Sequence, residues 1–187
     1  ADSFLEPHHL HKMLSKYIIL AETEKSLMVL RPYQYYATEK IISRVENSTN
    51  NGYIWHTTGS GKTLTSFKAS QLLMDNPEVY KVVFVVDRRD LDFQTTKEFN
   101  NFSDGSVDGT DNTKALVKQF GDDTKLIVTT IQKLNNAIGS SRYENTMVHL
   151  KQKRIVFIFD ECHRTQFGET HKRIKKHFLK SQMFGFT

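Results

Sequence analysis

Residues 81–87 read KVVFVVD, and residues 154–160 read RIVFIFD. Both stretches are apolar almost throughout and lack the alternation of a strand with one wet face, so each is predicted to be a strand buried on both faces. Helical patterns separate such strands, for example over residues 64–74 and 131–138. Strands that alternate with helices require right-handed crossovers between parallel neighbours, and the sequence therefore predicts a three-layer α/β fold.

The remaining segments fit this alternation. Further strands are predicted over residues 53–56 and 126–129, with a last one beginning within 183–186. Further helices are predicted over residues 8–20, 91–99, 113–120 and 168–179, and a loop over 100–112. Pro32 suits the first turn of a helix that ends near Glu46.

The composition excludes several classes of protein. The 187 residues suffice for about one domain, and Cys162 is the only cysteine, which excludes a disulfide framework and a cysteine-based zinc site. No apolar run approaches the roughly 18 residues of a membrane span, and the first residues lack the organisation of a signal peptide. We therefore expect a cytoplasmic enzyme with no membrane partner, whose net charge of +5 is compatible with a polyanion.

Residues 53–63, YIWHTTGSGKT, carry the clearest chemistry. A short strand runs into a glycine-containing loop that opens a helix, which is how backbone N–H groups are aimed at phosphates. We name residues 56–63 the phosphate loop. Lys62 is expected to reach the β- and γ-phosphates of a nucleotide, and the Thr63 hydroxyl to ligate Mg²⁺. His56 stands where the strict pattern has glycine, and the other phosphate contacts are assigned to Thr58, Gly59, Ser60 and Gly61.

The other half of the site is acidic and follows the strand predicted over residues 155–159. That strand would deliver Asp160 and Glu161 to the carboxyl edge of the sheet, where open α/β sheets bind ligands. Asp160 is expected to hold Mg²⁺, and Glu161 to orient and deprotonate the water that attacks the γ-phosphate. His163 admits two interpretations: a structural histidine, or a residue that couples the nucleotide site to a partner site.

These segments together resemble a known family. HTTGSGKT (56–63), DECH (160–163) and FGFT (184–187) resemble motifs I, II and III of superfamily 2 helicases and translocases, and LRPYQ (30–34) resembles their Q motif. Three segments resemble the restriction (R) subunit of type I restriction–modification enzymes: FVVDRRDLDFQ (84–94), VTTIQKL (128–134) and FIFDECHRTQFG (157–168). The resemblance is close from about residue 30 onward and vaguer over the first 25 residues.

The resemblance implies a RecA-like P-loop NTPase fold that uses ATP and Mg²⁺ to move double-stranded DNA. It implies that the Gln34 amide reads adenine, with Tyr33 or Arg31 stacked on the base or beside it. Four residues that align with motifs Ia and Ib are expected to hold phosphates of one DNA strand: Arg88, Arg89, Thr130 and Gln132. In that family the R subunit docks on modification and specificity subunits, so the choice of DNA sequence would lie outside this chain.

The resemblance also implies a division of the chain. Residues 1–25 are expected to be a helical lead or linker, and residues 26–187 the first RecA-like motor domain, ending within motif III. The nuclease domain and the second motor domain of the family are not found in the sequence, so we expect nucleotide binding with little turnover. Two alternatives stay open: a helicase lobe from another superfamily 2 branch, and an inert ATP-binding or docking module.

Overall fold

The fold is built around a six-stranded parallel sheet with the strand order β3-β8-β7-β4-β6-β5. The computed structural model describes residues 6–21, 25–57, 59–86, 96–100, 108–109, 112–159 and 167–187. The strands are β3 (Gly52–Ile54), β4 (Lys81–Val86), β5 (Asp108–Gly109), β6 (Leu126–Thr130), β7 (Ile155–Phe159) and β8 (Ser181–Phe186). The prediction of a three-layer α/β fold is confirmed.

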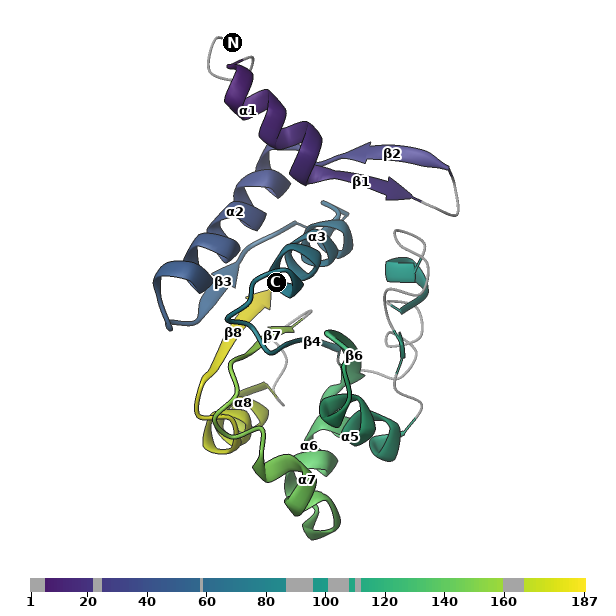
Figure 1. Ribbon diagram of the computed structural model, residues 1–187, viewed down its shortest axis with the longest axis vertical. Helices are drawn as coiled ribbons and strands as arrows, with labels where there is room; N and C mark the ends of the chain where they lie inside the picture. Colours follow the sequence, from purple (N-terminus) through teal and green to yellow (C-terminus); the bar gives the residue numbers. More distant parts are fainter. Residues whose placement is uncertain are drawn as a thin grey trace.

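Strand β4 shows why the fold has three layers. Its residues 82, 84 and 86 belong to one hydrophobic cluster, and Val83 and Val85 belong to the other. The first cluster includes residues of α2 (Pro32–Asn47) and α3 (Lys62–Met74), and the second includes residues of α5 (Thr113–Gly121), α6 (Ile131–Gly139) and α8 (Phe167–His177). Figure 1 shows these two groups of helices on opposite sides of the sheet. A strand without alternation is thus buried by both helical layers.

The first residues depart from the predicted helix over 8–20. Helix α1 covers only Pro7–Lys12, a π-helical turn covers Met13–Tyr17, and Ile18–Ala21 forms strand β1. Strand β1 pairs antiparallel with β2 (Ser26–Val29), so the predicted division after residue 25 falls between the two strands of one hairpin. The β-branched pair Ile18 and Ile19 favours a strand once β2 supplies a partner.

The other elements follow the prediction closely, with three exceptions. The predicted loop over 100–112 contains the two-residue strand β5, which pairs with β6. Two short helices were not predicted: a 3-10 turn over Ser141–Tyr143 and α7 (Glu144–Val148). Of the predicted helix over 91–99, only its last residues are described, and residues 96–100 are helical. Among the described residues, no helix is long and apolar enough to cross a bilayer.

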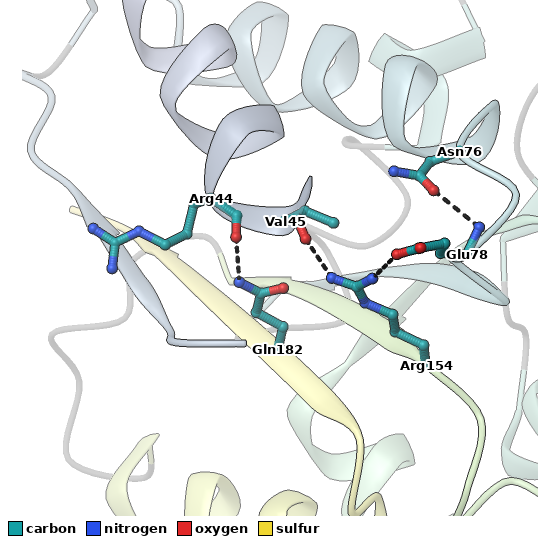
Figure 2. Close-up of polar contacts among 6 residues, drawn as sticks. All are labelled: Arg44, Val45, Asn76, Glu78, Arg154 and Gln182. Carbon is teal, nitrogen blue, oxygen red and sulfur yellow. Dashed lines mark hydrogen bonds and ion pairs between the residues drawn. The ribbon is translucent and has the colours of Figure 1, made fainter. Parts of the chain in front are cut away.

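The carboxyl end of α2 is tied to the amino-terminal edge of the sheet. Gln182 Nε2 donates to the Arg44 carbonyl at 3.2 Å, and the Arg154 guanidinium donates to the Val45 carbonyl and pairs with Glu78 (Figure 2). The last carbonyls of a helix lack partners within it and carry partial negative charge, so a cationic donor stabilises them. This network fixes α2 relative to β7 and β8.

Candidate nucleotide site

The phosphate loop connects β3 to α3 at the carboxyl edge of the sheet. Gly59 and Gly61 both have φ of 76°, in the left-handed region that glycine adopts without strain. Gly61 directly precedes α3, and Lys62 and Thr63 are the first two residues of that helix. The first N–H groups of a helix lack partners within it and attract anions, so the loop presents the geometry of a phosphate site. Thr58 lies outside the described residues.

The beginning of α2 holds the phosphate loop by three hydrogen bonds. The Tyr33 hydroxyl donates to the Ser60 carbonyl at 2.8 Å, and Gln34 Nε2 donates to the carbonyls of Ser60 and Gly61 at 3.1 and 3.3 Å. Gln34 Oε1 accepts from the Arg31 N–H at 2.8 Å. Gln34 is 3% exposed, and a Cβ on Gly61 would lie 2.4 Å from its Nε2. The loop and the glutamine are therefore fitted to one another.

This arrangement bears on the predicted adenine contact of Gln34. The amide nitrogen carries two hydrogens, and both point to loop carbonyls. A bidentate contact with adenine would require Nε2 to exchange one of these bonds, whereas Oε1 retains a second lone pair. The adenine contact stays a prediction, and holding the loop is the role that the structure shows.

A recess of about 480 Å³ lies beside the loop. Its lining residues are Arg31, Tyr33, Trp55, His56, Thr57, Gly59 and Ser60. Aromatic walls next to a phosphate-binding loop suit a nucleoside base. A larger recess of about 580 Å³ lies at the opposite edge of the sheet, among the residues that begin β8, and has no glycine loop. Of these two recesses, only the smaller one has the anion-binding geometry of the phosphate loop beside it.

His56 occupies the centre of this region. Its Nδ1 lies 3.1 Å from the Ser60 hydroxyl oxygen, and its ring contacts those of Tyr33 and Phe186, with both centroid separations 5.8 Å. Burial lowers the pKa of His56 below its usual 6.5, and the charge of Lys62 lowers this pKa further. The imidazole is therefore neutral near pH 7.

The acidic half of the predicted site begins at the same edge of the sheet. Strand β7 ends at Phe159, and β8 lies between β7 and β3, all three parallel. The carboxyl end of β7 therefore lies at the edge of the sheet that carries the phosphate loop, and the acidic pair follows Phe159 directly in the sequence. The predicted residues Asp160, Glu161 and His163 lie outside the described residues.

The predicted DNA contacts are described only in part. Arg88 and Arg89 lie outside the described residues, after the end of β4 at Val86. Thr130 is buried, and its hydroxyl oxygen accepts the Lys133 N–H at 3.2 Å as the cap of α6. Gln132 is exposed in the first turn of that helix. The structure thus shows a capping role for Thr130, and its DNA contact stays a prediction.

The sequence predicted no contact with the phosphate loop for two contributors to the site, the end of β8 and Trp55, although residues 184–187 were matched to motif III. Phe186 packs against His56, and the Thr187 carbonyl accepts the His56 N–H at 2.7 Å, so the end of β8 is part of the loop's support. Trp55, which is 85% exposed, lines the recess. An aromatic residue directly before a phosphate loop was the available signal for Trp55.

Comparison with known proteins places these features in a family. The SWI2/SNF2 ATPase family model matches residues 33–187. The chain is 54% identical over 187 residues to the endonuclease subunit of type I restriction enzyme SsaAORF53P of Staphylococcus saprophyticus, covering all of this chain and 20% of that protein. It is 44% identical over 191 residues to the C-terminal part of the putative MpnIIP endonuclease subunit of Mycoplasma pneumoniae, covering 95% of this chain and 92% of that one.

A solved structure shows the same fold. A nuclease-deletion mutant of the Type ISP restriction-modification enzyme LlaGI, in complex with a DNA substrate mimic, matches 84% of this chain and 17% of its own, with a TM-score of 0.62 and 23% identity. The present chain spans about a fifth of the length of the first curated relatives that it matches. With the phosphate loop and the parallel sheet in place, these matches show that the chain belongs to the SWI2/SNF2 ATPases and, among them, to the endonuclease subunits of type I restriction enzymes.

Proposed function

We propose that this chain binds and hydrolyses ATP as the first motor lobe of a type I restriction enzyme and thereby drives the movement of double-stranded DNA. The observation that carries the proposal is the phosphate loop, in which Gly59 and Gly61 adopt positive φ and Lys62 opens α3. Residues 26–187 would form this lobe within a longer protein, because the Staphylococcus saprophyticus relative is about five times as long.

The residues divide the work of phosphate chemistry. The N–H groups around Gly59–Gly61 and the Lys62 ammonium would bind the phosphates of ATP. Thr63 and Asp160 would hold Mg²⁺, and this is supported by the first turn of α3 and the end of β7, which lie at one edge of the sheet. Bound Mg²⁺ would neutralise charge that develops on the phosphates. Glu161 would orient the attacking water and accept its proton.

Turnover by the chain alone is expected to be slow. In related phosphoryl-transfer enzymes an arginine from a second element stabilises the transition state by a factor of about 10³–10⁵. The family resemblance places that arginine in a second motor domain. The proposal is therefore binding of ATP by this lobe, with full hydrolysis in the longer protein.

The DNA partner is proposed from the family and from the position of the basic residues. LlaGI was solved with a DNA substrate mimic, and Arg88 and Arg89 come two and three residues after Val86, the last residue of β4, in the sequence. Together with the exposed Gln132 they would hold DNA phosphates without reading sequence, whereas Thr130, which is buried, caps the helix that carries Gln132. Modification and specificity subunits would bind the full-length protein and choose the DNA site.

The test is ATP binding by calorimetry in the presence of Mg²⁺, with the wild-type chain compared with Lys62→Ala. Loss of a charge-assisted contact predicts about a 10- to 100-fold weaker affinity. Lys40→Ala removes the same charge from an exposed position of α2 and is the matched control. Equal affinity in all three proteins would contradict the proposal. Phosphate release measured with and without duplex DNA then distinguishes a motor lobe from an inert binding module.

A further inference from the structure

His56 joins three separate segments of the nucleotide site. Its Nδ1 contacts the Ser60 hydroxyl at 3.1 Å inside the phosphate loop, and its ring packs edge-on against Tyr33 at the start of α2. The ring also packs against Phe186, and the backbone N–H of His56 donates to the Thr187 carbonyl at 2.7 Å. A glycine in this place, as in the strict pattern, would keep only the backbone bond.

Ser60 is the residue through which these contacts act on the loop. Its carbonyl accepts from the Tyr33 hydroxyl and from Gln34, and its own N–H donates to the Thr57 carbonyl at 3.2 Å. The contact with His56 adds a side-chain tie to these backbone ties. Ser60 lies between Gly59 and Gly61, so fixing it also fixes the two residues with positive φ.

We propose that His56 is a positioning residue of the nucleotide site, which holds the phosphate loop through Ser60 and links it to the end of β8 through Phe186. This inference rests on the proposed function, because the loop must bind phosphates for its position to matter. It assigns to His56 two separable duties. The ring nitrogen sets the loop, and the ring face transmits the state of the loop to residues 181–187.

The charge state of the ring agrees with this role. Burial and the nearby Lys62 ammonium hold the pKa of His56 low, so the ring does not add a second cation against Lys62. A neutral imidazole can accept from the Ser60 hydroxyl or donate to it at Nδ1, depending on the tautomer.

Two substitutions separate the two duties. His56→Asn keeps a polar atom near the position of Nδ1 and removes the ring, whereas His56→Phe keeps a ring and removes the nitrogen. We expect His56→Phe to weaken ATP binding about 3- to 10-fold, the range for one neutral hydrogen bond. If the link to β8 exists, ATP should slow hydrogen exchange in residues 181–187 of the wild type. His56→Asn is expected to bind ATP within about 2-fold of wild type and to lose this slowing.

Ser60→Ala removes the same bond from the other side. It is expected to match His56→Phe in ATP affinity. The double variant that combines Ser60→Ala with His56→Phe is expected to bind ATP as well as either single variant, because both substitutions remove the same hydrogen bond. His171→Phe is the matched control: His171 is also half-buried, has a lowered pKa and contacts Asn51 at 3.3 Å, but it lies on α8. We expect its ATP affinity to equal that of the wild type.

The outcomes are distinct. Additive losses in the double variant, or equal losses in His56→Asn and His56→Phe, would overturn the positioning role of Nδ1. Unchanged exchange of residues 181–187 on addition of ATP to the wild type would overturn the link to β8. Failure of the wild-type chain to bind ATP would overturn the proposed function and this inference with it. Ser60→Ala keeps the test decisive if the His56 variants do not fold.

Discussion

Helix α2 is anchored at both ends, but the two anchors differ in chemistry. At its start, the uncharged groups of Tyr33 and Gln34 donate to carbonyls of the phosphate loop. At its end, the charged Arg154 donates to a helix carbonyl and pairs with Glu78, beside the amide of Gln182 (Figure 2). The first anchor holds a loop with two glycines in the left-handed conformation, and the second holds a helix against two strands.

This difference in chemistry suggests that the start of α2 serves ligand binding and that its end serves the stability of the fold. A cationic group on the last carbonyls of a helix stabilises the folded state whether or not a ligand is present. Neutral bonds to a loop contribute less to folding, but they decide where the loop carbonyls and N–H groups point. Changes at the start of α2 should therefore alter binding, and changes at its end should alter the free energy of unfolding.

The largest effect is expected from Gly61→Ala. The substitution places a Cβ 2.4 Å from Gln34 Nε2 on a residue with φ of 76°. Steric conflict and backbone strain act together, so ATP binding should weaken by about 100-fold, which corresponds to roughly 3 kcal/mol. Calorimetry measures this loss. Gly59→Ala is the matched comparison, because Gly59 has the same φ but no atom lies within 4 Å of its Cβ position, and its loss should be much smaller.

Arg154→Met should lower the free energy of unfolding by about 1–2 kcal/mol, since it removes a cap from α2 and a partner from Glu78. Urea denaturation measures this change. Arg173→Met, at an exposed position of α8, should stay within about 0.5 kcal/mol of wild type. ATP affinity should be unchanged in both variants. A loss of affinity in Arg154→Met alone would contradict the claim that the end of α2 affects stability and not ATP binding.

Gln34→Ala tests whether the loop anchor also reads the base. It removes bonds to Ser60 and Gly61, so ATP binding should weaken about 3- to 10-fold. If Gln34 also contacts adenine, the preference for ATP over GTP should shrink in the same variant. Competition binding with both nucleotides checks this. An unchanged preference would refute the adenine contact and leave the anchoring role intact.

The smallest effect is expected from pH. Burial lowers the pKa of His56, His171 and His177 below the usual 6.5. The unfolded chain therefore binds protons at a pH where the folded chain does not, and the free energy of unfolding should fall as pH drops below about 6.5. Urea denaturation midpoints at about pH 7.5 and 5.5 measure how steeply the free energy of unfolding changes with pH. Replacement of His171 and His177 by Gln should flatten this dependence, and an unchanged slope would contradict these assignments.

The central sheet was predictable because its strands carry their own signal. The runs that form β4 and β7 are buried on both faces, and apart from Lys81 each is apolar, so neither depends on a particular neighbour for its identity. The phosphate loop was predictable for a similar local reason: Gly61, Lys62 and Thr63 are adjacent in the sequence. Such features need no knowledge of distant contacts.

The features that were missed depend on distant partners. The helical spacing of apolar residues 10, 13, 14, 17 and 18 led to a helix predicted over 8–20, and pairing with Ser26–Val29 makes Ile18–Ala21 a strand instead. Gln34 and Ser60 are 26 positions apart, and their hydrogen bond exists because α2 packs beside α3. The two hydrogen bonds from the Gln34 amide to the phosphate loop could not be predicted from a short motif, because they form only when α2 packs beside α3.

Trp55 gives this molecule a natural optical reporter. It is the single tryptophan of the chain, it is 85% exposed, and it lines the recess beside the phosphate loop. Indole fluorescence will therefore come from one position at the edge of the proposed binding site, with no contribution from another tryptophan in the core. A change in its emission on rapid mixing would time the arrival and departure of a nucleotide without any attached dye.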